Sequence, residues 1–199
     1  DDSLDITGWD LQKALELFRK TNPPLLEHLK SPTRYVDRWA LAARLLALLP
    51  RYYSPIACMH HYLRMAENNL QAYLKTDEGR LKECFYVLRP VLACLWIEQG
   101  RGPAPTEFQA LVDGVVDNCS LQAEINRLLE VKRRTGEPQR CARSDIVVSF
   151  AREQLDRLAA VRLSAPETRD RGVLDRQFLQ VLVEVNGGTI DVARTRPAT

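Results

Sequence analysis

The chain has 199 residues, of which 45% are hydrophobic, and its 28 basic and 26 acidic residues give a net charge of +2. A chain of this length buries enough apolar surface to fold without a disulfide or metal staple, and its charge gives no overall attraction to nucleic acid or membranes. The longest stretch without Asp, Glu, Lys or Arg, residues 52–63, is shorter than the roughly 18 apolar residues of a membrane span. Five cysteines without a C-x-x-C spacing indicate a reducing compartment, so we expect a soluble, cytoplasmic protein.

The first fifty residues begin with a short alternating run and continue with helical patterns. Residues 3–7 alternate polar and apolar and predict one strand, for which no other segment offers a convincing partner. We therefore expect its sheet to lie in missing sequence. Asp10 is a cap for the first helix, and Asn22 with two prolines ends it. Short and long apolar patterns then predict helices over 25–30 and 36–49.

The rest of the chain continues with helices joined by short connections. Ser54-Pro55 is a helix start signal, and Pro90 predicts a kink inside a later helix. The apolar periodicity predicts helices over about 55–75, 80–99, 106–116, 120–135, 144–163 and 171–185, with a loose tail over 186–199. About nine helices predict an all-α protein, a single multi-helix bundle with one possible N-terminal strand left from a missing mixed sheet. We expect residues 1–9 to be the remnant strand and 10–185 the helical domain.

One predicted helix carries three polar side chains beside its buried side. Lys82, Tyr86 and Arg89 follow one another at spacings of four and three residues, so they point the same way. Such a trio can bind phosphates, because Arg offers a fork of donors, Lys a point charge and Tyr a donor or stacking surface. The alternative is a boundary of long side chains whose polar ends reach solvent.

The preceding helix contains His61 and Tyr62 on neighbouring faces. A histidine here can hold a phosphate or move a proton, and the alternative is a hydrogen-bonded histidine at the edge of the core. Further on, residues 131–176 hold 11 Lys or Arg and 7 Asp or Glu. The run Lys132-Arg133-Arg134 fits nucleic acid, and equally fits the negative end of a helix dipole.

Several catalytic motifs are absent from the 199 residues. There is no G-x-x-x-x-G-K-[ST], G-x-G-x-x-G, H-E-x-x-H or G-x-S-x-G motif. There is also no Asp-x-Asp pair, which in a two-metal active site places two carboxylates on one face of a strand. This chain does not supply such a pair in the usual way.

Four phrases, taken together, resemble a known family. They include Asn22-Pro23, Ser31-Pro32 and Tyr86-Val87-Leu88-Arg89-Pro90, and they span residues 4–15, 21–32, 61–63 and 86–97. In this order they resemble the predicted nucleotidyltransferases of the DNA polymerase beta superfamily known as the RNA-ligase-associated type, over roughly residues 4–185. The resemblance implies an N-terminal mixed sheet with a Gly-Ser turn and an Asp-x-Asp pair, and this chain contains neither.

The resemblance also implies roles for individual residues. Asp5 matches the third carboxylate of the family, which implies Mg²⁺ coordination and a catalytic role in activating the acceptor; the alternative is an exposed terminal charge. Lys82 and Arg89 are implied in triphosphate contact, and Tyr86 or Tyr62 in packing against base or sugar. His61 and Tyr62 match positions that face the cleft, as do Lys82, Tyr86 and Arg89. Lys13, Asn22 and Glu27 match further motif positions of the family, of which Asn22 is expected to cap a helix or turn the backbone and Glu27 to pair with a basic residue.

These observations support three hypotheses. The first is the C-terminal helical part of a nucleotidyltransferase that moves a nucleoside monophosphate from an NTP to an unknown acceptor, an RNA or a small molecule, and is inactive alone. The second is a non-catalytic binding or interaction module, with self-association through the face that the missing sheet would cover. The third, a helical toxin-type ribonuclease, is disfavoured because neither His60 nor His61 follows an Arg by the required spacing.

Overall fold

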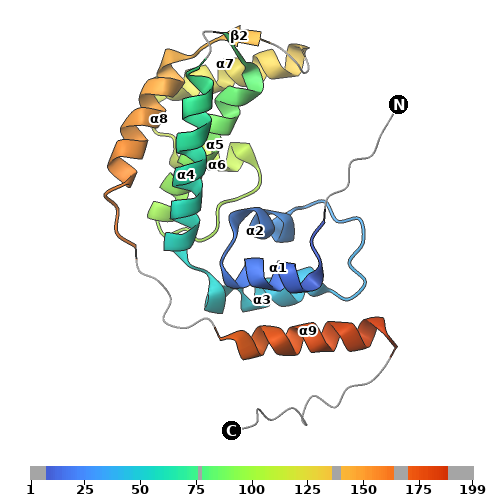
Figure 1. Cartoon of the computed structure of the whole chain (residues 1–199). Helices are drawn as coiled ribbons and strands as arrows, with labels where there is room; N and C mark the ends of the chain where they lie inside the picture. The colour runs from blue at the N-terminus through green and yellow to red at the C-terminus, as the bar shows by residue number, and fades with distance from the viewer. Residues whose placement is uncertain (1–7, 76–77, 136–139, 164–169, 188–199) are drawn as a thin grey trace. The chain divides into compact units, whose positions relative to one another are not determined.

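A computed structural model describes residues 8–75, 78–135, 140–163 and 170–187. Within these ranges it contains nine helices and two three-residue strands, which confirms the all-α prediction (Figure 1). The chain divides into two compact units, a division that the sequence pattern did not predict. Unit 1 comprises Asp1–Tyr53 and Pro166–Thr199, and unit 2 comprises Ser54–Ala165. The predicted strand over 3–7 lies outside the described residues, as does all of the predicted tail except 186 and 187.

Unit 1 contains α1 (Leu11–Arg19), α2 (Pro23–Lys30), α3 (Leu41–Tyr52) and α9 (Arg171–Val185). The predicted caps are confirmed: Oδ1 of Asp10 accepts from the backbone N–H of Lys13 at 2.7 Å, and Oδ1 of Asn22 accepts from that of Leu25 at 3.2 Å. These side chains satisfy backbone donors that a first helical turn leaves without partners.

The start predicted for α3 was wrong. Its first residue is Leu41, because Ala40 takes a left-handed conformation with φ of 49° and the carboxylate of Asp37 accepts from the backbone N–H of Leu41 at 3.0 Å. The helix also continues through Pro50 to Tyr52. A proline in the last turn removes one backbone hydrogen bond and leaves the preceding turns intact.

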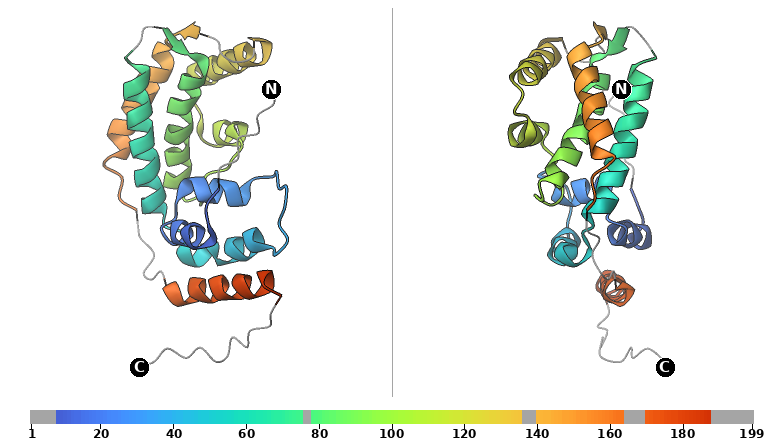
Figure 2. Two further views of the ribbon diagram at one scale, coloured as in Figure 1. Left: turned by 45° about the vertical axis from the view of Figure 1, so that its right-hand side comes forward. Right: turned by 90° about the vertical axis from the view of Figure 1, so that its left-hand side faces the viewer.

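In unit 1, α9, at the far end of the sequence, packs against α1 and lies beside α3 (Figure 2). Phe18 and Tyr52 are almost fully buried, and their ring centroids lie 5.4 Å apart. The hydroxyl of Tyr52 donates to the backbone carbonyl of Asp170, just before α9, and its carbonyl accepts from the hydroxyl of Thr21 at 2.8 Å. Arg44 of α3 forms an ion pair with Glu184 of α9 at 2.9 Å.

Unit 2 contains five helices and a small antiparallel sheet. In chain order these are α4 (Pro55–Tyr73), β1 (Glu78–Arg80), α5 (Leu81–Glu98), α6 (Phe108–Val115), α7 (Cys119–Thr135), β2 (Arg140–Ala142) and α8 (Asp145–Leu158). The two strands were not predicted; Gly79 pairs with Cys141. The helix predicted over 144–163 ends at Leu158, five residues early.

The core of unit 2 is built around α5, which packs against α4, α6 and α8. Eleven of its residues are buried, and Pro90 lies inside the helix. Tyr73 ties the end of α4 to its neighbours: its hydroxyl oxygen accepts from the backbone N–H of Ser144 at 2.9 Å and lies 3.0 Å from Sγ of Cys84. Among the described residues, no helix combines the length and the apolar character needed to cross a membrane.

Candidate functional site

Helix α5 holds the predicted polar trio in a fixed register. Its buried residues, among them Cys84, Leu88 and Val91, anchor one side of the helix in the core. Lys82, Tyr86 and Arg89 therefore emerge on the other side, as the spacing predicted. Tyr86 is 55% exposed, and Lys82 and Arg89 are half-buried. We refer to these three residues as the α5 polar face.

The Arg89 guanidinium is engaged with the loop that leads into α6. Nη1 donates to the carbonyl of Thr106 at 2.9 Å, and Nη2 donates to the carbonyl of Pro105 at 3.2 Å. These hydrogen bonds fix both the side chain and the loop, since a charged donor binds a carbonyl more strongly than a neutral one. Arg89 thus has a structural role that the sequence did not reveal, and its contact with a triphosphate stays a prediction.

Two further helices reach the edge of the α5 polar face. The ring of Phe85 meets that of Phe108 of α6 edge to face, with centroids 5.4 Å apart. On α7, Nζ of Lys132 lies 5.5 Å from the centroid of Phe85. An ammonium over an aromatic face is attracted by the ring quadrupole. The ammonium of Lys132 thus joins the end of α7 to the ring of Phe85 on α5.

Helical spacing alone places Phe85 on the apolar side of its helix and Lys132 in a basic run, and it does not connect the two residues. One signal was present: Lys132 follows the buried residues Ile125 and Leu128 at helical spacing. This spacing places it on the side of α7 that packs inward. The partner of Lys132, however, is decided by how α7 packs in three dimensions.

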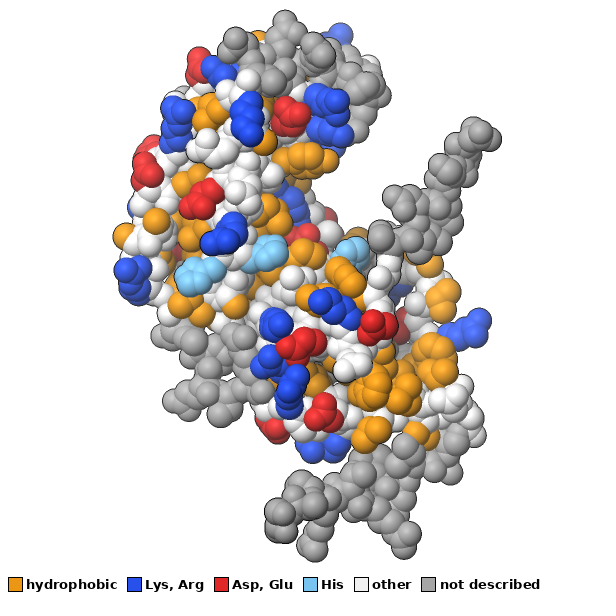
Figure 3. Space-filling view, viewed as in Figure 1, with side chains coloured by type: hydrophobic (Ala, Val, Ile, Leu, Met, Phe, Trp, Pro, Cys, Tyr) orange, Lys and Arg blue, Asp and Glu red, His pale blue; other side chains and the backbone are white. Residues whose placement is uncertain are grey.

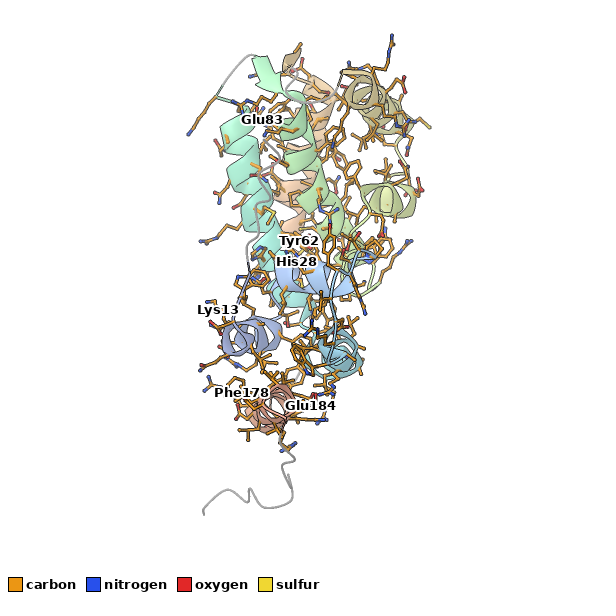
Figure 4. All side chains as sticks on the ribbon, turned by 90° about the vertical axis from the view of Figure 1, so that its right-hand side faces the viewer. Lys13, His28, Tyr62, Glu83, Phe178 and Glu184 are labelled. Atoms are coloured by element: carbon orange, nitrogen blue, oxygen red, sulfur yellow. The ribbon has the colours of Figure 1, made fainter. Side chains whose placement is uncertain are left out.

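His61 and Tyr62 lie on α4, away from Lys82. Helices α4 and α5 run antiparallel, with the Asn69 amide donating to the carbonyl of Tyr86 at 2.8 Å and Tyr73 beside Cys84. Lys82 is therefore level with the end of α4, roughly 18 Å along the helix axis from His61. Figure 4 shows this separation between Tyr62 and Glu83, the neighbour of Lys82.

The two tyrosines proposed to pack against a base differ in exposure. Tyr62 is 4% exposed, and its ring lies edge to face with that of His61 at a centroid distance of 6.1 Å. Tyr86 is 55% exposed. A ring that a ligand can reach without displacing core side chains is the better stacking surface, so Tyr86 is the stronger of the two candidates.

Charge near the end of α7 is only partly balanced. Arg127 donates two hydrogen bonds to Glu124, at 2.8 and 2.7 Å, and these bonds lower the pKa of Glu124. Beyond this pair the helix ends in Lys132, Arg133 and Arg134, all exposed. Arg133 lies 3.8 Å from Glu130, with both side chains exposed, a geometry that contributes little stability.

The residues implied for metal binding do not form a described site. Asp5 lies outside the described residues. Within the described parts of the chain, no group of three or more His, Cys, Asp or Glu side chains lies close enough to hold a metal ion. The Mg²⁺ coordination implied for Asp5 therefore stays a prediction.

Unit 1 contains the remaining motif positions and a cavity of about 380 Å³ between α1 and α9. Lys13 is exposed on α1 (Figure 4), and Glu27 is half-buried on α2. Glu16, at the edge of the cavity, accepts two hydrogen bonds from Arg19, at 2.9 and 2.8 Å, and these hold its pKa at about 2. Arg171 of α9 lies 3.7 Å from the same carboxylate.

Comparison with known proteins identifies the family. A family model described as the RNA repair pathway DNA polymerase beta family matches residues 1–180. The uncharacterized protein YcgL of Bacillus subtilis (strain 168) is 40% identical over 192 residues, which cover 94% of this chain and 74% of that protein. No solved structure matches the chain. The chain therefore belongs to the RNA repair pathway DNA polymerase beta family.

Proposed function

We propose that this chain forms the C-terminal helical part of a nucleotidyltransferase that transfers a nucleoside monophosphate from an NTP to an acceptor. Membership of a DNA polymerase beta family supports this class of chemistry. The 199 residues contain neither the Gly-Ser turn nor the Asp-x-Asp pair of the family. In this proposal, both motifs are supplied by sequence outside these residues. The chain alone is then inactive and contributes binding and positioning.

The observation that carries the proposal is the α5 polar face. A helix fixed in the core presents an ammonium, an exposed phenol ring and a guanidinium in one direction. Transfer of a nucleotidyl group depends mainly on positioning and on stabilising charge that moves onto the leaving pyrophosphate. Lys82 supplies a positive charge for the phosphates, and Tyr86 supplies a flat surface for a base or sugar.

In this proposal, the position of Arg89 is set by the loop that precedes α6. Its contacts with the carbonyls of Pro105 and Thr106 leave it less able to swing toward a ligand than Lys82. It contributes a fixed positive charge beside the phosphates, whereas Lys82 adapts its side chain to them. His61 and Tyr62, about 18 Å along α4 from the level of Lys82, do not touch the same phosphate group. On this proposal the half-buried His61 faces another part of the bound nucleotide or acceptor, and the buried Tyr62 supports the His61 ring from beneath through their edge-to-face contact.

The test is calorimetric titration with ATP, GTP, CTP and UTP, each with and without Mg²⁺. The site variant is Lys82→Ala/Tyr86→Ala, which leaves the Arg89 loop contacts in place. The matched control is Lys20→Ala/Tyr35→Ala, which removes the same two side-chain types from unit 1. We expect sub-millimolar binding of at least one NTP, lost in the site variant and kept in the control. A folded wild-type chain that binds no NTP, or equal loss in both variants, would contradict the proposal.

The second candidate function is an interaction module, and one observation favours it. Unit 1 exposes large apolar side chains in the segment before α3: Tyr35 is 94% exposed, Val36 73% and Trp39 38%. Exposed apolar side chains that gather in one segment are typical of a contact surface. Light scattering over a concentration series tests this candidate by self-association. A dimer that Tyr35→Ser/Val36→Ser converts to monomer supports it, and a monomer at every concentration counts against self-association.

A further inference from the structure

One end of unit 2 gathers more positive than negative side chains. The start of α5, the β1–β2 pair and the C-terminal turns of α7 all lie at this end. Figure 3 shows several Lys and Arg side chains there, with acidic side chains scattered among them. The cations with described side chains at this end are Lys75, Arg80, Lys82, Lys132, Arg133, Arg134 and Arg143. The nearby acids are Glu83, which accepts from the backbone N–H of Arg80 at 3.1 Å, and the exposed Glu130 and Asp145.

Aromatic rings lie among these cations. Lys132 of α7 sits over Phe85, so the end of α7 adjoins the first two turns of α5. With about 100° of rotation per residue, Lys82 lies between Phe85 and Tyr86 around the axis of α5. Tyr86, on the side of Lys82 away from α7, is more than half exposed. From α7 to Tyr86, charged and aromatic side chains therefore alternate across one surface.

Lys82 and Tyr86 alone also fit the nucleotide of the proposed function, whereas the longer series of cations and rings fits a polymer of nucleotides. Proteins that hold a single nucleic-acid strand combine cations that follow the phosphates with aromatic side chains on which unpaired bases stack. A duplex hides its base faces, and an isolated phosphate needs no ring. We propose that Lys82, Phe85, Tyr86, Lys132, Arg133 and Arg134, here named the α5–α7 face, bind single-stranded nucleic acid. As the site of the acceptor strand, this assignment rests on the proposed nucleotidyltransferase function; as a binding surface it stands on its own.

Within the face, each group has a distinct task. Arg133 and Arg134 are exposed at the end of α7, about 100° and 200° around its axis from Lys132. A strand that passes over this end of the helix therefore meets them, and their phosphate contacts make binding dependent on salt. Tyr86 stacks on a base and contributes affinity that salt does not change. Lys132 and Phe85 join the two helices and present a cation beside the strand. The phosphate contacts thus lie mainly on α7, and the base contact lies on α5.

The test uses fluorescence anisotropy with labelled twelve-nucleotide oligouridylate and oligothymidylate, and a duplex of equal length, across a salt series. We expect both single strands to bind more tightly than the duplex. Arg133→Ala/Arg134→Ala should weaken binding about tenfold and reduce the slope of log K against log salt by about 1.4. Tyr86→Ala should weaken binding about tenfold and leave the slope unchanged.

The matched control is Arg64→Ala/Arg152→Ala, which removes two exposed arginines from the middle of α4 and α8. It makes the same change in net charge and should bind like the wild type. Circular dichroism and thermal melting confirm that every variant is folded. Equal weakening in the control and in Arg133→Ala/Arg134→Ala overturns the proposal, because overall charge then explains the binding. A folded wild-type chain that binds neither single strand at low salt also overturns it.

The same variants separate this proposal from the proposed function. Arg133→Ala/Arg134→Ala should weaken strand binding about tenfold and leave NTP binding in calorimetry unchanged. NTP binding without strand binding refutes the α5–α7 face and leaves the nucleotidyltransferase proposal standing. Strand binding without NTP binding refutes the nucleotidyltransferase proposal and leaves the α5–α7 face standing as a binding surface. A further titration with oligodeoxyuridylate, which differs from oligouridylate only in the 2′-hydroxyl, identifies the sugar that the face prefers.

Discussion

Trp96 of α5 occupies the space that a side chain at Gly114 of α6 would fill. A Cβ placed on Gly114 would lie 2.6 Å from Cζ3 of the Trp96 indole and 3.0 Å from a guanidinium nitrogen of Arg101. The Arg101 guanidinium in turn lies 5.0 Å from the centroid of the indole ring. Glycine at this position allows α6 to approach α5 closely. The close approach also positions the loop before α6, whose carbonyl groups accept hydrogen bonds from Arg89.

Gly114→Ala is therefore expected to destabilise unit 2, although Ala normally stabilises a helix by roughly 1 kcal/mol relative to Gly. The overlap with Trp96 forces a packing change that costs about 1–3 kcal/mol, so the net effect is a loss of stability. Urea denaturation of the wild type and the variant measures it. In the Trp96→Phe background, which lacks the overlapping ring, the same substitution should be neutral or stabilising. An equal loss in both backgrounds would show that the indole is not the cause.

Arg89→Ala removes the two hydrogen bonds to the carbonyls of Pro105 and Thr106. Because the donor is charged and partly buried, we expect the free energy of unfolding to fall by about 1.5–3 kcal/mol. Hydrogen exchange of the loop before α6 should accelerate. Lys82→Ala on the same helix is the control and should leave both quantities nearly unchanged. A stable Arg89→Ala variant with unchanged exchange would assign Arg89 to ligand contact alone.

Helix boundaries were predictable from sequence where the side chain that caps the helix is itself in the pattern. Asp10, Asn22 and Ser54 all accept the backbone hydrogen bonds expected of them. The start of α3 was not predictable, because the apolar periodicity continues through Trp39 while the left-handed Ala40 breaks the helix. The β1–β2 pair was missed because three-residue strands separated by α5, α6 and α7 carry too little pattern.

The candidate site, too, was predictable from sequence in part. The register of Lys82, Tyr86 and Arg89 follows from helical spacing and needed no tertiary information. The partners of Arg89 and the contact between Lys132 and Phe85 depend on the packing of α6 and α7, which periodicity does not encode. The family resemblance also grouped His61 with the α5 residues as cleft positions, and only the antiparallel pairing of α4 and α5 reveals the distance between His61 and Lys82.

Glu16 should make the stability of unit 1 depend on pH in the acid range. The hydrogen bonds from Arg19 lower its pKa from the ordinary 4.5 to about 2. A carboxylate with a lowered pKa stabilises the folded state above the unfolded pKa, and this contribution is lost as the pH falls from about 4.5 toward 2. Glu16→Gln should therefore lose less stability than the wild type over this range in acid denaturation. The exposed Glu67→Gln on α4 is the control, and identical acid curves for Glu16→Gln and wild type would refute the prediction.

Tyr52 should couple α9 to the rest of unit 1. Its hydroxyl donates to the carbonyl of Asp170, and the ring is 1% exposed. Tyr52→Phe removes the hydroxyl and keeps the packing against Phe18, so we expect a loss of about 1 kcal/mol. Hydrogen exchange should rise most in the first turns of α9. Tyr35→Phe, at a residue that is 94% exposed, should change neither measurement, and a uniform rise across unit 1 would contradict a local coupling.

Lys132 should contribute separately to folding and to strand binding, and two substitutions distinguish the contributions. Lys132→Met removes the charge and keeps an unbranched side chain that packs against the Phe85 ring through sulfur. We expect its stability to stay within about 0.5 kcal/mol of the wild type, because the sulfur contact replaces much of the cation–π attraction. Its affinity for single-stranded oligonucleotides should fall, with a salt slope reduced by about 0.7.

Lys132→Ala removes both the charge and the contact with the ring. It should lose the same affinity as Lys132→Met and, in addition, about 0.5–1 kcal/mol of stability. Urea denaturation and anisotropy on the two variants give the separation directly. If Lys132→Met binds strands as tightly as the wild type, the ammonium serves the α5–α7 packing alone, and the cations of the face reduce to Lys82 and the two arginines at the end of α7.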